Sequence, residues 1–133
     1  MQNPFIIGES VYLRPIEVED AARYATWLND PEVRPGVGRT AALSRLNEEE
    51  IIRGMHQKSN QQILAIVEKE TDTHIGGTGV HSIDTVSRCC SFGIFIGDRE
   101  RWSRGYATEA THLVLQHVFD SLNLNRIQLN VFS

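Results

Sequence analysis

Residues 102–108 have the composition of an anion-binding turn. The run reads Trp-Ser-Arg-Gly-Tyr-Ala-Thr and directly precedes a long helical pattern. The first N–H groups of a helix lack acceptors within the helix, and the aligned peptide dipoles add partial positive charge, so a phosphate is stabilised there. Gly105 and Ala107 leave the backbone open to a ligand, and Arg104 adds a cation. The run therefore predicts a phosphate site at a helix start.

The spacing within this run differs from two common phosphate-binding motifs. It is neither the GxGxxG dinucleotide pattern nor the GxxxxGK[ST] loop, so other phosphate carriers are expected. Arg104 fits a phosphate ligand better than a general surface cation, because a cation is disfavoured at this end of the dipole without an anion. Glu109 favours the dipole by itself and is interpreted as structural. Trp102 has two open interpretations, a core aromatic or a side chain that faces the ligand.

The elements around the run are a strand before it and a helix after it. Residues 105–122 place apolar side chains on one face at helical spacing. That face consists of Ala107, Ala110, Val114, Val118 and Leu122. Residues 88–96 alternate as a strand, with Phe92, Ile94 and Ile96 expected on one face. The candidate site should therefore lie between a strand end and a helix start.

The rest of the chain predicts further strands and helices in a single domain. Strands are expected at residues 10–14, 62–68, 74–83 and 126–132, and helices at residues 17–28 and 47–58. The strands at 62–68, 74–83 and 88–96 should form an antiparallel meander. Asn47 and Glu50 resemble a capping box at the start of the second helix. The order of elements is typical of an α/β fold around a mixed sheet.

Composition argues against several classes of protein. The chain has 133 residues, a net charge of −4 and 41% hydrophobic residues, which fits one domain and argues against nucleic acid as a partner. No run approaches the ~20 apolar residues of a membrane span, and residues 1–8 lack the pattern of a secretory signal. We therefore expect a soluble, cytoplasmic protein.

Cysteine and histidine give no signal for a metal. Cys89 and Cys90 are adjacent, so in a strand they point to opposite faces, and neither has a CxxC partner. Both are interpreted as reduced structural thiols. The five histidines show no HExxH pattern or cluster with cysteine, so no metal site is expected.

The run at 102–108 resembles the coenzyme A motif of the GNAT acetyltransferases, usually written [QR]-x-x-G-x-[GA]. The similarity is greatest to the ribosomal-protein N-terminal acetyltransferase (RimJ/RimL-like) branch, in which a tryptophan often fills the first position, as Trp102 does. Ser103 departs from the glycine that is more usual there. Four other segments look like the same branch in the same order, at residues 13–16, 27–31, 75–77 and 96–98.

This resemblance implies a fold, a reaction and a set of binding residues. The fold would be α/β (α+β), with a mixed, mostly antiparallel sheet flanked by helices. The strand at 88–96 would splay from the next strand, leaving a gap in which pantetheine pairs with strand backbone. An amine would attack the thioester of acetyl-CoA directly, and a backbone N–H near Phe95 would stabilise the oxyanion. The implied acetyl-CoA-binding residues are Phe95, Ile96, Gly97, Trp102, Ser103, Arg104, Gly105, Tyr106, Ala107 and Thr108.

The resemblance covers only the front three quarters of the family's domain. Residues 1–133 would be a single, C-terminally incomplete domain, without the last helix and pair of strands. The family's tyrosine or serine acid would follow residue 132, so the catalytic residues are not assigned. The strand at 126–132 would then be an open edge. Truncation, or a second copy in a homodimer, would explain such an edge.

Two alternative functions stay open at this point. One is a catalytically degenerate domain that binds CoA or acts as a scaffold, and the other is an unrelated phosphate-ligand binder. His81 could act as a base, although a structural strand histidine is the preferred interpretation. The acceptor could be a protein N-terminus, an amino acid or a small amine. The loop at 32–45, with Arg34, Arg39 and Arg45, borders the expected substrate site but has no decisive charge pattern.

Overall fold

The computed structural model describes residues 1, 3–32, 42, 44–57, 60–84 and 86–120, and the backbone of residues 126–129. Within this part of the chain lie six strands, three α-helices and two short 3-10 helices. In chain order they are β1 Ile6–Ile7, β2 Val11–Pro15, η1 Val18–Asp20, α1 Ala21–Asn29, α3 Arg45–His56, β3 Gln62–Glu68, β4 Thr73–Asp84, β5 Cys89–Ile96, η2 Arg99–Arg101, α4 Tyr106–Asp120 and β6 Arg126–Leu129.

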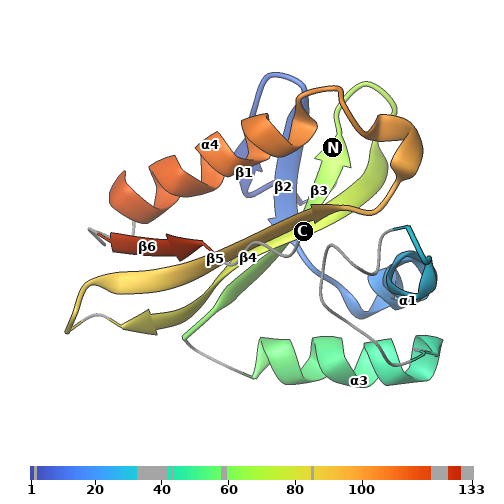
Figure 1. The fold of residues 1–133 in the computed structure, drawn as a ribbon, viewed down its shortest axis with the longest axis horizontal. Helices are drawn as coiled ribbons and strands as arrows, with labels where there is room; N and C mark the ends of the chain where they lie inside the picture. Colours follow the sequence, from blue (N-terminus) through green and yellow to red (C-terminus); the bar gives the residue numbers. More distant parts are fainter. Residues whose placement is uncertain are drawn as a thin grey trace.

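The strands form one sheet whose order in space is the order in the chain. Neighbouring strands from β1 to β5 are antiparallel, whereas β5 and β6 are parallel. Figure 1 shows α4 on one side of the sheet, and α1 with α3 on the other. The predicted mixed, mostly antiparallel sheet with flanking helices is confirmed, as is the meander β3–β4–β5. No helix in the described part of the chain is long and apolar enough to cross a membrane.

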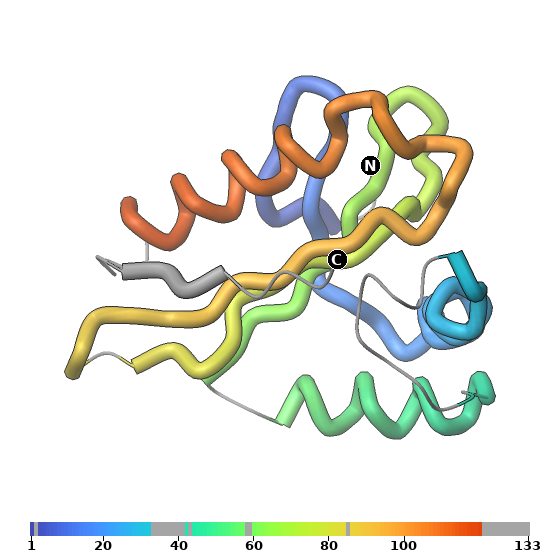
Figure 2. The backbone as a smooth tube through the Cα atoms, viewed as in Figure 1, coloured from blue at the N-terminus to red at the C-terminus, as the bar shows by residue number. Residues whose placement is uncertain are grey.

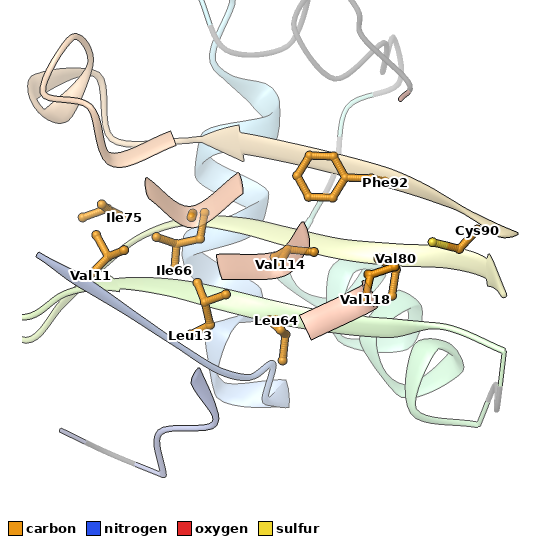
Figure 3. Close-up of a cluster of buried hydrophobic side chains, with 11 residues drawn as sticks. Val11, Leu13, Leu64, Ile66, Ile75, Val80, Cys90, Phe92, Val114 and Val118 are labelled. Carbon is orange, nitrogen blue, oxygen red and sulfur yellow. The ribbon is translucent and has the colours of Figure 1, made fainter. Parts of the chain in front are cut away.

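The main core lies between the sheet and α4. It consists of Val11, Leu13, Leu64, Ile66, Ile75, Val80, Cys90, Phe92, Ala110, Val114 and Val118 (Figure 3). Ile94 and Ile96 pack against this cluster, which confirms that they share a face with Phe92. Ala107 is exposed, so its predicted place on the packed face of α4 is wrong. The helix begins at Tyr106, which packs against the core together with Ala110, whereas Ala107 lies on the exposed side of the first turn.

A second, smaller cluster lies under α1 and α3. Tyr24, Ile16, Ala21 and Ile52 are buried there, with Trp27 and Phe95 packed against them. Two glycines permit this close packing. A Cβ at Gly77 would lie 2.4 Å from the Tyr24 hydroxyl oxygen, and one at Gly97 would lie 2.1 Å from a ring carbon of Trp27.

The start of α1 is fixed to the sheet by a buried ion pair. The Arg14 guanidinium donates to both oxygens of Asp20 at 2.9 Å, and His74 Nδ1 lies 3.5 Å from Asp20 Oδ1. Burial alone would raise the pKa of Asp20, but the bonds from Arg14 and His74 and from the backbone of Glu17 hold it well below 3.8. The Asp20 carboxylate, at the start of α1, therefore pairs with side chains of β2 and β4.

Glu109 connects the first turn of α4 to β2. Its Oε2 accepts backbone N–H groups from Ser10 at 2.9 Å and Val11 at 2.8 Å, although these residues are about a hundred positions apart in sequence. The structural interpretation of Glu109 is thus supported by contacts beyond the helix dipole. Figure 2 shows the turn before α4 at the same end of the molecule as the β1–β2 and β3–β4 turns.

The predicted N-cap of α3, Asn47, is wrong by three residues. Ser44 is the N-cap, because its hydroxyl accepts the Asn47 N–H at 3.1 Å while the Asn47 side chain accepts the Ser44 N–H at 3.2 Å. Asn47 is therefore the last residue of the capping box, at helix position N3, and not its first. Most of the predicted loop at 32–45, with Arg34 and Arg39, lies outside the described residues, as do Leu122 and residues 130–133.

Adding a methyl group at two glycines should have opposite effects on stability. Gly97→Ala places its Cβ against Trp27 and should lower the free energy of unfolding by about 1–3 kcal/mol. Gly54→Ala, within α3 and with no atom near the new Cβ, should raise it by about 0.5–1 kcal/mol. Urea denaturation of both variants measures this. Equal effects would contradict the packing of α1 on Gly97.

Because of the Arg14–Asp20 pair, the free energy of unfolding should decrease at acidic pH. Because the folded pKa of Asp20 lies below its unfolded value, its contribution is complete above about pH 4 and is lost as the pH falls further. Asp20→Asn should lower the free energy of unfolding by about 1–3 kcal/mol at pH 7. In this variant the free energy of unfolding should decrease less as the pH falls. Urea denaturation between pH 7 and pH 3 tests it, with the exposed Glu19→Gln as the control. An unchanged acid profile in Asp20→Asn would refute the assignment.

Candidate functional site

A cavity of about 450 Å³ opens between the carboxyl end of β5 and the start of α4. One wall comes from the strand end, and the other comes from the turn and the first residues of the helix. The cavity is lined by Glu32, Ile94, Phe95, Ile96, Arg101, Trp102, Ser103, Gly105, Tyr106, Ala107 and Thr108. It is therefore built mainly by two segments that the helix–sheet packing brings together, with Glu32 contributed from the chain after α1.

Eight of the ten residues predicted to bind acetyl-CoA line this cavity. They are Phe95, Ile96, Trp102, Ser103, Gly105, Tyr106, Ala107 and Thr108. Gly97 and Arg104 are not among the lining residues. The close approach of Trp27 accounts for the glycine at position 97.

The backbone of the turn is shaped for close approach at the helix start. Ser103 and Gly105 have positive φ angles of 66° and 78°. The carbonyl of Gly105 accepts the N–H of Glu109 at 3.0 Å, which closes the first turn of α4. Glu109 is thus the first residue whose N–H bonds within the helix. The N–H groups of Tyr106, Ala107 and Thr108 come before it in the chain and have no intrahelical acceptor. Such a helix start favours a phosphate group.

Arg104 lies near a carboxylate on the protein itself. Its side chain is 56% exposed, and Nη1 is 4.0 Å from Glu68 Oε2. A contact of that length to an exposed cation is weak. The phosphate role of Arg104 thus stays a prediction, and the side chain has freedom to reorient.

Trp102 caps the end of β5. Its indole Nε1 donates to the carbonyl of Ile96 at 2.7 Å, while the side chain stays 42% exposed and lines the cavity. The interpretation of Trp102 as a core aromatic is therefore wrong, because the ring is exposed and belongs to neither core cluster. The ring borders the cavity, and its contact with a ligand stays a prediction.

The register of β4 and β5 decides which backbone groups face outward. Gly77 pairs with Phe95, and the Gly97 N–H donates to Ile75 at 2.8 Å. Because hydrogen-bonded and non-bonded pairs alternate between antiparallel strands, the N–H of Phe95 points toward β4. The N–H and C=O groups of Ile94 and Ile96 point away from β4. The Phe95 N–H is therefore committed to the sheet, and Ile96 offers the outward N–H nearest the predicted position.

Pairing of β5 with β6 uses only the first half of β5 in the described chain. The pairs run from Cys89–Arg126 to Phe92–Leu129. Residues 130–133, which follow β6 in the sequence, lie outside the described residues. The predicted splay between the two strands falls on this part and stays a prediction.

A buried carboxylate behind the cavity was missed by sequence reasoning. Glu68, at the end of β3, accepts hydrogen bonds from the hydroxyls of Thr71 at 2.6 Å and Tyr106 at 2.7 Å, and lies 3.3 Å from Arg101 Nη2. These bonds lower its pKa from 4.5 to about 2. The only sequence signal was an acidic residue at the end of an apolar strand, which is a common arrangement.

The other candidates lie away from the cavity. His81 is half-buried on β4 opposite Ser91, and His112 is exposed on α4. His117 lies 3.1 Å from Gln62 Oε1, and burial lowers its pKa. Cys90 is a buried free thiol, and its pKa is raised by burial. Among the described residues, no cluster of histidine, cysteine and carboxylates could hold a metal ion.

Comparison with known proteins agrees with this geometry. The profile of the GNAT acetyltransferase domain matches residues 10–133. The N-acetyltransferase p20 of Bacillus licheniformis is 32% identical over 126 residues, which cover 92% of this chain and 70% of p20.

Two solved structures share the fold at lower identity. The spermidine N-acetyltransferase of Vibrio cholerae, solved with CoA and spermine, has a TM-score of 0.83 at 21% identity and covers 93% of this chain and 72% of its own. Mycobacterium smegmatis RimJ, solved with CoA-disulfide, has a TM-score of 0.81 at 19% identity and covers 96% of this chain and 68% of its own. With the family profile and p20, they lead to one assignment. The chain belongs to the GNAT family of acetyltransferases and is an N-acetyltransferase enzyme.

Proposed function

We propose that the cavity between β5 and α4 binds acetyl-CoA and that the chain transfers its acetyl group to a primary amine. The observation that carries the proposal is the lining of the cavity. The end of β5, where the N–H groups of Ile94 and Ile96 point away from β4, meets a helix start whose first N–H groups have no intrahelical acceptor. The amine attacks the thioester carbonyl directly, and the thiolate of CoA leaves. A protein N-terminus, an amino acid and a small amine are the candidate acceptors.

Each wall of the cavity suits one part of acetyl-CoA. Pantetheine would lie along β5 and pair with the outward backbone groups of Ile94 and the outward N–H of Ile96, whose carbonyl already accepts the Trp102 indole N–H. The pyrophosphate would lie against the N–H groups of residues 105–108, where Arg104 can turn from Glu68 toward it. The Ile96 N–H is then the preferred donor to the oxyanion that develops on the thioester.

The acceptor class is proposed on the names of similar proteins. The Vibrio cholerae structure contains spermine, and RimJ represents the branch that the sequence resembles.

A cytoplasmic location is proposed because acetyl-CoA is available there. A dodecameric form is described for the Vibrio cholerae enzyme, and we propose that a second copy covers β6, the last strand of the sheet in the described chain. A single monomeric species in light scattering at high concentration would oppose that pairing.

Acetyl transfer predicts thiol release that depends on an amine. Mixing the chain with acetyl-CoA and, in turn, an N-terminal peptide, an amino acid or spermidine should release free CoA with at least one acceptor. A thiol reagent measures the rate. Thermal stabilisation by CoA without thiol release from any amine would favour a degenerate CoA-binding domain. Equal competition by free phosphate or nucleotides would instead favour a general phosphate binder.

Removing the indole N–H should weaken the binding of acetyl-CoA. Trp102→Phe keeps an aromatic ring but loses the bond to Ile96, so the turn is less firmly held at the strand end. We expect the KM for acetyl-CoA to rise about 2-fold to 10-fold, the range of one hydrogen bond, and the KM for the amine to stay the same. Steady-state kinetics checks this, with Phe119→Leu at the exposed far end of α4 as control. A change confined to the amine KM would contradict the cavity assignment.

A further inference from the structure

Glu68 is a buried carboxylate that has no place among the groups that contact acetyl-CoA. Its side chain is 4% exposed, and it does not line the cavity. Its hydrogen bonds come from the hydroxyls of Thr71 and Tyr106 and from the Arg101 guanidinium, with Arg104 at 4.0 Å. Side chains from the β3–β4 turn, η2 and the start of α4 therefore converge on one anion.

Two of these partners enclose the turn that lines the cavity. Arg101 ends η2 and is held a second time by Asp98 at 2.6 Å. Tyr106 is the first residue of α4. Between them the backbone passes twice through positive φ, at Ser103 and Gly105. Glycine adopts this conformation readily, whereas at Ser103 it persists only when the surrounding structure fixes it. The bonds of Glu68 fix the chain on both sides of this strained part.

The charge of Glu68 acts against an anionic ligand. Hydrogen bonds from Thr71, Tyr106 and Arg101 lower its pKa to about 2, so the carboxylate is ionised throughout the neutral range. A fixed negative charge near a phosphate site repels the phosphate. The Glu68 carboxylate also attracts the guanidinium groups of Arg101 and Arg104, which could otherwise interact with the phosphate. By charge alone, Glu68 would therefore weaken the binding of acetyl-CoA.

We propose that Glu68 is a positioning residue that sets the shape of the acetyl-CoA-binding turn before the ligand arrives. It holds Arg101 and Tyr106 so that the N–H groups at the start of α4 already face the cavity. This inference rests on the proposed function of the cavity. The two possible roles of Glu68 predict opposite changes in CoA binding. If Glu68 positions the turn, neutralising it should weaken the binding of CoA, whereas a purely electrostatic role requires tighter binding.

The test compares two isosteric substitutions on neighbouring carboxylates. Glu68→Gln removes the buried charge with little change in volume, and Glu70→Gln removes the same charge from an exposed position two residues away. Calorimetric titration with CoA gives the Kd of each variant and of the unmodified chain. Steady-state kinetics gives the KM for acetyl-CoA and for the amine separately.

The expected result is confined to one ligand. Glu68→Gln should raise the Kd for CoA and the KM for acetyl-CoA about tenfold or more, the effect of losing hydrogen bonds to a charged group. The KM for the amine should stay unchanged, and Glu70→Gln should bind CoA as the unmodified chain does. Equal or tighter binding by Glu68→Gln would overturn the positioning role. Failure of the unmodified chain to bind CoA would instead overturn the proposed function.

A second variant keeps the test valid if Glu68→Gln fails to fold. Thr71 is exposed, lies outside the cavity and contributes one hydrogen bond to Glu68 without a charge. Thr71→Ala leaves the carboxylate in place but less firmly held, so the Kd for CoA should rise about 2-fold to 10-fold. Circular dichroism establishes that each variant is folded. An unchanged Kd in folded Thr71→Ala would count against the proposal.

Discussion

The start of α4 must stay beside the carboxyl end of β5, and contacts from distant residues keep it there. Glu109 binds the N–H groups of Ser10 and Val11, which fixes the first turn of the helix to β2. Glu68 binds Tyr106 from β3, and Trp102 binds the last residue of β5. Each bond joins the turn to a different strand. A helix start that is held at this position can offer its free N–H groups to a ligand without first being ordered.

The opposite face of the sheet imposes a constraint of its own. Aromatic rings of α1 pack directly on β4 and β5, where Gly77 and Gly97 leave room for Tyr24 and Trp27. The ring of Phe95 joins this cluster, with its centroid 5.6 Å from that of Tyr24. Phe95 is thereby fixed from below, while Ile94 and Ile96 are fixed by the core under α4. The end of β5 is held between two packed layers, so its outward backbone groups have a defined direction.

The regular elements could be predicted from the sequence because they depend on local periodicity. The alternation in β5 and the helical spacing of Ala110, Val114 and Val118 each indicate which side is buried. The N-cap of α3 was predicted wrongly because two pairs of residues, Ser44–Asn47 and Asn47–Glu50, both have the three-residue spacing of a capping box. Only the hydrogen bonds distinguish the two pairs. Local pattern was sufficient for the meander β3–β4–β5, but it missed the two-residue strand β1 and the cap of α3.

The details of the site depend on contacts that no local pattern contains. The need for glycine at position 97 comes from Trp27, 70 positions earlier in the chain, because a Cβ there would lie 2.1 Å from a ring carbon of Trp27. The role of Glu68 depends on partners 33 and 38 positions later. The choice between the N–H groups of Phe95 and Ile96 follows from the register of β5 with β4. The sequence does not determine this register to within one residue, and a shift of one residue would exchange the two N–H groups.

The central claim is that CoA binds between β5 and α4. The most direct test is a titration of the ¹⁵N-labelled chain with CoA, followed by the backbone and indole N–H signals in NMR spectra. The account predicts that the largest shifts occur at Ile94, Ile96 and residues 102–108, including the indole N–H of Trp102. Shifts centred on α1 and α3, or none at saturating CoA, would contradict it.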